Sequence, residues 1–240
     1  MNDARGDRAS WHELEKRTWE LLQREHLEWL ARGRTGAGRI DLARPDFLHA
    51  DLHGLRFPGA RFATPRFSGA SLAASDLRGT EITDGEMPRV VLVYTGADGA
   101  RWTNCDLSAA SADLASFAAA KLSGCKLPGA ALRRVSFAGA VLDHCVFDGA
   151  VLTDANFEGT HVTSSSFRDA DLSRVDGGEF DPRGSARRAV FTDCDLRGAN
   201  LDRLRLAETR FERCKLGGAM GRPTIRGEVS FVDCDEPPWA

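Results

Sequence analysis

An apolar residue recurs at every fifth position over about half of this chain, and this period constrains the fold more than any other feature. Steps of five from Phe47 to Leu172 reach 26 positions, and every one is apolar, although only 42% of the chain is hydrophobic. Two residues before each centre lies a mostly small residue, and the other three positions hold most of the charge and glycine. A helix repeats every 3.6 residues or so and a strand every two, so neither explains this period. The chain must turn a corner every five residues, with two side chains pointing inward.

The five-residue units read "ADLHG" from Ala50, "CDLSA" from Cys105, "ANFEG" from Ala155 and "ADLSR" from Ala170. They resemble the motif of the pentapeptide repeat proteins, a small residue, Asp or Asn, and then Leu or Phe, over residues 45–235. The resemblance implies an all-β fold: a right-handed quadrilateral β-helix with four pentapeptides to a turn and, at this length, about nine coils. Turn-rich corners would explain the 24 glycines.

The cysteines test the implied turn of twenty residues independently. All six lie in the small column, and neighbours within each set are 20 residues apart: Cys105, Cys125 and Cys145, then Cys194, Cys214 and Cys234. Residues one turn apart would stack at about 4.8 Å. We expect reduced packing thiols, because a small thiol fits a column of Ala, Ser and Thr and no secretory signal is visible. Neither a Cys-x-x-Cys pair nor clustered His accompanies them, so we expect no metal site.

The register fails once, between Gly177 and Phe191. The intervening "GEFDPRGSARRA" contains either nine extra residues or four. Nine would stack Cys194 over Ser165, whereas four would continue the column of Phe167 into Phe191. We favour four, because two ladders of like residues would then run on without interruption.

The loop insertion within 178–190 is the candidate binding site, because loops on a rigid scaffold often carry function. Its candidate residues are Phe180, Asp181, Arg183, Arg187 and Arg188. The alternative is a tolerated insertion that binds nothing. The segments "GGEFDPRG" and "AVFTDCDLRGANL" resemble segments of the quinolone-resistance pentapeptide proteins, which protect DNA gyrase.

Residues 11–33 predict an amphipathic α-helix that follows a disordered N-terminus, residues 1–10. Its apolar half carries three tryptophans: Trp11, Trp19 and Trp29. We expect the helix to cap the first coil, whose backbone edge would otherwise be free to pair with another chain. The alternative is that the tryptophans dock another protein.

At the other end, "GRPTIRGEVSFVDCDEPPWA" loses the repeat, and residues 236–240 form a tail. The gyrase-protecting proteins typically dimerise through this end. Because the sequence departs from the pattern here, a monomer and an end-to-end homodimer both remain open.

Composition limits the function. The 32 basic and 35 acidic residues give a net charge of −3, which disfavours direct binding of nucleic acid. No run approaches the roughly 18 apolar residues of a membrane-spanning helix, so we expect a cytoplasmic protein without a membrane anchor. We expect neither an enzyme nor a cofactor, because the repeat fills the interior with Ala, Leu and Phe and leaves no concave site.

The resemblance implies a protein that imitates B-form DNA and binds DNA gyrase or another type II topoisomerase, conferring antibiotic or toxin resistance. Such mimicry requires negative charge along one face. Over residues 46–176 the four faces have net charges of −1, −1, −2 and 0, which is no acidic stripe. The alternative is a structural or protein-interaction scaffold without DNA mimicry.

Overall fold

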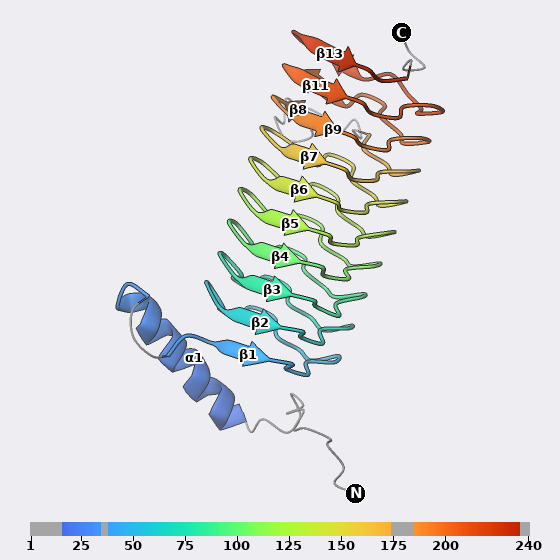
Figure 1. Ribbon diagram of the computed structural model, residues 1–240. Helices are drawn as coiled ribbons and strands as arrows, with labels where there is room; N and C mark the ends of the chain where they lie inside the picture. The colour runs from blue at the N-terminus through green and yellow to red at the C-terminus, as the bar shows by residue number, and fades with distance from the viewer. Residues whose placement is uncertain (1–15, 35–37, 174–184, 236–240) are drawn as a thin grey trace, which may run out of the picture.

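The computed structural model describes residues 16–34, 38–173 and 185–235, which form one helix at the end of a parallel β-solenoid (Figure 1). Helix α1 spans Lys16–Ala31. The main ladder contains β1 (Asp41–Ala43), β2 (Arg61–Ala63), β3 (Glu81–Thr83), β4 (Arg101–Thr103), β5 (Lys121–Ser123), β6 (Val141–Asp143), β7 (His161–Thr163), β9 (Val190–Thr192), β11 (Thr209–Glu212) and β13 (Val229–Val232). A second sheet orders β12 (Thr224–Ile225), β10 (Arg205–Ala207) and β8 (Ser185–Arg187).

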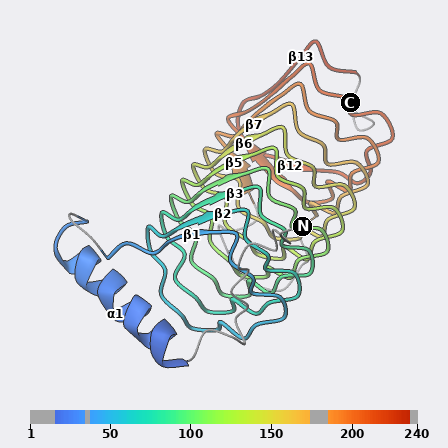
Figure 2. The ribbon, with the colours of Figure 1, turned by 60° about the horizontal axis from the view of Figure 1, so that its bottom comes forward.

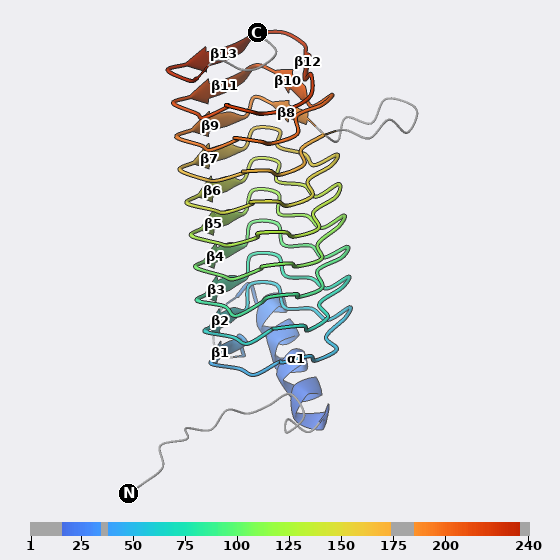
Figure 3. The same cartoon turned by 90° about the vertical axis from the view of Figure 1, so that its right-hand side faces the viewer.

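From β1 to β7 each turn of the solenoid stacks on the next with an offset of twenty residues, as in the pairing of Leu42 with Phe62. Isolated parallel bridges repeat this offset on the other three sides, for example between Asp51 and Ser71. We number the four sides by their apolar centres in the first turn: face 1 (Leu42), face 2 (Phe47), face 3 (Leu52) and face 4 (Phe57). The expected fold class, a quadrilateral β-helix of about nine turns with an N-terminal helix, is confirmed (Figures 2 and 3).

The corners explain why glycine and small polar residues recur. The residue two positions after each centre has a positive φ, +54° at Ala74 and +53° at Asn104. The third residue after a centre closes the turn, as where the Ala50 amide donates to the Phe47 carbonyl at 3.0 Å. Beside a longer side chain only glycine fits: a Cβ on Gly124 would lie 2.6 Å from Asn104 Oδ1.

Stacked side chains fill the interior. The rings of Phe147 and Phe167, one turn apart, lie parallel with their centroids 4.8 Å apart. Hydroxyl groups of the small column are satisfied internally, since Thr160 Oγ1 donates to the Phe137 carbonyl at 2.8 Å. Ser75 and Thr95 do the same, donating to the carbonyls of Leu52 (2.8 Å) and Leu72 (2.7 Å), so these buried hydroxyls keep a hydrogen bond.

The cysteine prediction is confirmed: Cys105, Cys125 and Cys145 are free, buried and stacked on consecutive turns. Two backbone bonds fix the stack, from Lys126 N to the Cys105 carbonyl (2.9 Å) and from Val146 N to the Cys125 carbonyl (3.0 Å). A hydrogen bond with Cys125, together with burial, raises the pKa of the Cys105 and Cys145 thiols, which keeps both protonated.

The two sets of cysteines belong to one column. Cys194 follows Ser165, because the amide of Asp195 donates to the Ser165 carbonyl at 3.0 Å. Cys214 and Cys234 continue the column, and the Cys214 amide lies 3.3 Å from Cys234 Sγ. One serine thus separates two runs of three thiols.

The four-residue interpretation of the break is wrong, and nine extra residues are present. Val162 of β7 pairs with Phe191 of β9, an offset of 29 residues instead of twenty. Phe167 is followed by Leu196, since the Phe167 amide donates to the Asp195 carbonyl. The favoured ladder of like residues failed because every apolar centre fits every other, so Phe over Leu costs little.

The extra residues lie between Leu172 and Ala186. Ala186 is completely buried and takes the centre of face 4 one turn after Phe157, as the bond from Gly159 N to the Arg187 carbonyl shows. Strand β8 therefore belongs to a regular turn. Most of the insertion falls on residues 174–184, outside the described residues.

The backbone edges at the two ends of the rod are covered in different ways. The solenoid begins at Asp41 of β1, ahead of the expected boundary at 45, and α1 packs beside it. At the last turn, the Asp235 carboxylate accepts bonds from the amides of Leu216 (2.7 Å) and Gly217 (3.0 Å). A side chain thus replaces a carbonyl of the turn that would follow.

Candidate interaction surfaces

The insertion candidates fall into two groups. Phe180, Asp181 and Arg183 lie outside the described residues. Arg187 and Arg188, expected in the loop, instead occupy the corner after Ala186. This corrects the expectation, and the reason is that the insertion ends before β8.

Both corner arginines engage acids of neighbouring turns. Arg187 Nη2 lies 3.4 Å from Glu208 Oε1, and Arg188 Nη2 donates to Glu158 Oε1 at 2.6 Å. The four side chains are about half exposed. Ion pairs at such exposure contribute about 1 kcal/mol or less, so they orient the arginines more than they stabilise the rod.

The tryptophans of the predicted cap are placed differently from one another. Trp11 lies outside the described residues, and Trp19 lies within α1. Trp29 is 6% exposed, and the guanidinium carbon of Arg39 lies 5.6 Å from its ring centroid. Trp29 is therefore buried where α1 meets the first turn and offers no surface to another protein.

Charged side chains gather on the outward strand positions of faces 1 and 2. On face 1, Arg61 Nε donates to Glu81 Oε2 at 2.6 Å. On face 2, Arg66 lies between Asp46 (2.6 Å) and Glu86 (3.4 Å) on the turns before and after it. Both signs occur in each column, although Arg101 neighbours Lys121 on face 1 and Glu86 neighbours Asp106 on face 2, so neither column is a stripe of one sign.

Faces 3 and 4 differ, because their outward strand positions are uncharged over several consecutive turns. We call these positions the neutral side. On face 3 they are Ser71, Val91, Ser111, Ala131 and Val151, and on face 4 they are Gly96, Ser116, Ser136 and Asn156. Depletion of charge is what distinguishes the centre of protein interfaces from the rest of a surface.

Two large apolar residues mark the corner between these faces. Tyr94, the chain's single tyrosine, is 66% exposed, and Leu114 on the next turn is partly exposed. Both have a positive φ, +59° and +61°, which L-residues other than Asn and Asp rarely adopt. Sequence reasoning missed this surface because net charge was summed over whole faces, corners included; sorting the outward positions alone would have found it.

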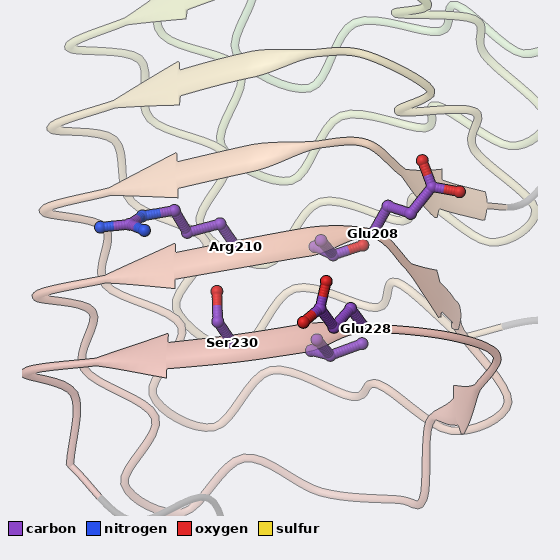
Figure 4. A pocket seen from close by; sticks show the side chains of 6 residues that line it. Glu208, Arg210, Glu228 and Ser230 are labelled. Atoms are coloured by element: carbon purple, nitrogen blue, oxygen red, sulfur yellow. The ribbon is translucent and has the colours of Figure 1, made fainter.

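A shallow pocket of about 350 Å³ lies between β11 and β13 near the C-terminal end (Figure 4). It is lined by Glu208, Thr209, Arg210, Glu228, Val229 and Ser230. Neither a histidine nor a cysteine contributes to its lining, and Glu208 is engaged by Arg187. The Thr209 hydroxyl is engaged as well, since it donates to the Ala207 carbonyl at 3.1 Å.

Two other kinds of feature are absent from residues 16–34, 38–173 and 185–235. There, no three His, Cys, Asp or Glu side chains converge in a way that could hold a metal ion. Within the same ranges, no helix has the length and apolar character needed to cross a membrane.

The comparisons with known proteins agree with this geometry. The family model for pentapeptide repeats matches in eight copies, over residues 115–154, 130–169, 150–176 and 187–219. No curated protein matches the chain.

Two solved structures of other proteins are also similar to this chain. HetL, a pentapeptide repeat protein involved in heterocyst differentiation regulation from the cyanobacterium Nostoc, is 18% identical, with 82% of this chain and 92% of that chain covered and a TM-score of 0.30. QnrB1, a plasmid-mediated fluoroquinolone resistance protein, is 14% identical, with 83% and 94% covered and a TM-score of 0.36. The twenty-residue turn, the filled interior and the eight matched copies lead to one conclusion: the chain is a pentapeptide repeat protein.

Proposed function

We propose that this protein works without catalysis, as a rigid cytoplasmic scaffold that binds a protein partner along its neutral side. The observation that supports this proposal concerns the outward strand positions: on faces 1 and 2 they carry ion pairs, whereas those of the neutral side are uncharged over several turns and flank Tyr94, although ion pairs such as Asp113–Arg133 lie nearby on face 3. Tyrosine supplies a large contact area at little entropic cost and is enriched at interfaces. A surface with uncharged outward strand positions and no excess of positive charge fits a protein partner better than a nucleic acid, whose phosphates demand positive charge.

Imitation of DNA is the second candidate, and the ion pairs argue against its simplest form. A DNA mimic would present unpaired carboxylates in a row. Here Glu81 contacts both Arg61 (2.6 Å) and Arg39 (3.3 Å), and Asp113 contacts Arg133 (3.2 Å). These pairings leave little continuous negative potential, so binding to DNA gyrase by mimicry is the less favoured function.

The docking surface is tested by a matched pair of substitutions. Val91 on face 3 and Val141 on face 1 both stand immediately before a buried centre, so their replacement by Arg alters the rod equally. The wild-type protein and both variants would be immobilised, and bound proteins from the source cell compared by quantitative mass spectrometry. We expect at least one protein to be lost with Val91→Arg and with Tyr94→Ala but retained with Val141→Arg. If the three variants retain the same proteins, the neutral side is not the docking surface.

A separate assay addresses the topoisomerase. Purified DNA gyrase would be assayed for supercoiling with and without a fluoroquinolone, in the presence of stoichiometric wild-type protein. Because the scaffold proposal does not depend on gyrase, we expect no effect. Inhibition or protection would favour the mimicry function, and its persistence in Val91→Arg would place the contact elsewhere on the rod.

A further inference from the structure

His26 of α1 is completely buried, unlike the exposed His53 and His144. The amide of Ile40 donates to His26 Nδ1 at 3.0 Å, and His26 Nε2 lies 3.1 Å from the Pro58 carbonyl oxygen. A backbone amide can only donate and a carbonyl can only accept. Nδ1 is therefore unprotonated, Nε2 carries the hydrogen, and the docked imidazole is neutral.

The carbonyl that His26 contacts belongs to the open backbone edge of the first turn. One turn later, the equivalent carbonyls of Asp76 and Arg78 accept the amides of Phe57 and Gly59, each at 2.7 Å. Among the described residues, no backbone amide of a preceding turn donates to the carbonyls of Arg56 and Pro58. Instead, side chains of α1 approach them: Gln23 Nε2 donates to the Arg56 carbonyl at 3.3 Å, and His26 Nε2 donates to that of Pro58.

This geometry resists a second proton on His26. Protonation of Nδ1 would place an N–H against the Ile40 N–H and remove an acceptor from a buried amide. Burial lowers the pKa of His26; the Pro58 hydrogen bond opposes this shift, and the cations Arg39 and Arg34 add to it.

The surroundings contain little negative charge to stabilise an imidazolium. The His26 ring stacks on Trp29 of the same helix, with the centroids 5.4 Å apart. Arg39 donates from Nε to the Gly59 carbonyl at 2.7 Å and from Nη2 to Glu81 at 3.3 Å, so that nearby acid is already paired. A cation at His26 would therefore add to two others.

We propose that α1 is a proton-sensitive latch: protonation of His26 breaks its bond with Ile40, releases α1 from the first turn and exposes the Arg56 and Pro58 carbonyls. The sixteen residues of α1 are marginal as an isolated helix, so release also unfolds it.

The sign of the effect follows from linkage. The docked histidine binds a proton less tightly than the released one, so docking is strongest above a pH of about 6.5. As the pH falls below that value, docking weakens by up to about tenfold per pH unit, until the pKa of the docked group is reached.

Hydrogen–deuterium exchange of the full chain, corrected for the intrinsic pH dependence of exchange, tests the latch. Between pH values of about 6.5 and 5.5 we expect protection of the α1 amides to fall by up to about tenfold, relative to amides of β4, β5 and β6. His26→Gln, which cannot titrate, should abolish the dependence, whereas His53→Gln should keep it. Constant α1 protection in the wild type, or a pH response retained in His26→Gln, would overturn the proposal.

A second measurement covers the case in which His26→Gln releases α1 at every pH. The ring resonances of His26, assigned by their absence in that variant, would be followed by NMR in the wild type. Their titration midpoint should coincide with the loss of α1 protection and lie below the ordinary histidine value. A midpoint at the ordinary value, or one that does not track the protection, would refute the latch.

Discussion

Replacing Phe137 by Ala should destabilise the rod strongly, because the ring is completely buried at the centre of face 4. It stacks between Phe117 and Phe157, with centroid distances of 5.7 and 5.5 Å, and meets Phe147 edge-on at 5.9 Å. Removal of a buried Phe side chain costs about 3–5 kcal/mol. Each lost aromatic pair adds roughly 0.5–1.5 kcal/mol, so we expect the upper part of that range.

The expected cost converts into a melting temperature. In a chain of this size, 1 kcal/mol corresponds to a shift of about 2–4 °C, so Phe137→Ala should lower Tm by roughly 8–20 °C. Phe137→Leu loses the same three aromatic pairs but keeps most of the apolar volume, so it should cost less than Phe137→Ala. Circular dichroism during heating, followed at a β-sheet wavelength, measures the series.

The control lies on the neighbouring turn segment. Arg133 pairs with Asp113 at 3.2 Å, with side-chain exposures of 53% and 28%. Loss of so exposed an ion pair costs about 1 kcal/mol or less, so Arg133→Ala should shift Tm by less than about 4 °C. Equal shifts for Phe137→Ala and Arg133→Ala would refute the assignment of stability to the stacked centres.

Three further predictions concern the insertion, the thiols and the acid range. Deletion of residues 175–183 restores the five-residue spacing between Leu172 and Ala186, so Tm should stay within about 4 °C of the parent. Replacement of residues 185–188 by Gly and Ser removes the buried centre Ala186 and should lower Tm clearly. A larger fall in Tm for the deletion than for the replacement would contradict the nine-residue insertion. With a thiol reagent, the native protein should show one reacting cysteine, the partly exposed Cys234, and burial slows this reaction because it raises the pKa of the thiol. Cys234→Ser should abolish the reaction of the native protein. A fast reaction that survives in this variant would show that the column of buried cysteines opens. Hydrogen bonding from Arg78 lowers the pKa of Asp76, so this pair stabilises the fold above a pH of about 3.9, and its contribution disappears as the pH falls further. Asp76→Asn should flatten the dependence of the urea midpoint on pH between pH values of about 3 and 5. An unchanged slope would show that the Asp76–Arg78 pair does not contribute to stability.

The fold could be predicted from the sequence because its information is redundant. Twenty-six successive apolar centres specify the five-residue unit, and the spacing of six cysteines agrees with the twenty-residue turn that the family resemblance implies, so no single residue decides the fold. The size of the insertion lacked that redundancy. Phe191 fits equally after Val162 or Phe167 by hydrophobicity, and only the backbone pairing distinguishes the two registers.

The candidate surfaces were harder to predict for a related reason. Outward residues of a solenoid are free to vary, so a binding surface is a property of columns whose members lie twenty residues apart. Val91, Ser111 and Ala131 are adjacent in space and unremarkable along the chain. The arginines at 187 and 188 attracted attention because they are adjacent in sequence, yet each serves a different turn, one contacting Glu208 and the other Glu158.

The two ends of the rod show why a repeat alone does not define a protein of this kind. Every internal turn satisfies its neighbours through identical backbone bonds, so the terminal turns must find donors and acceptors elsewhere. Asp235 supplies an acceptor at the last turn, and Gln23 and His26 supply donors at the first. A carboxylate and an amide hold these roles at any pH near neutrality, whereas an imidazole does not. One terminal donor is His26, a neutral histidine whose two ring nitrogens are both hydrogen-bonded. The stability of the N-terminal end therefore depends on pH in a way that the interior turns do not share.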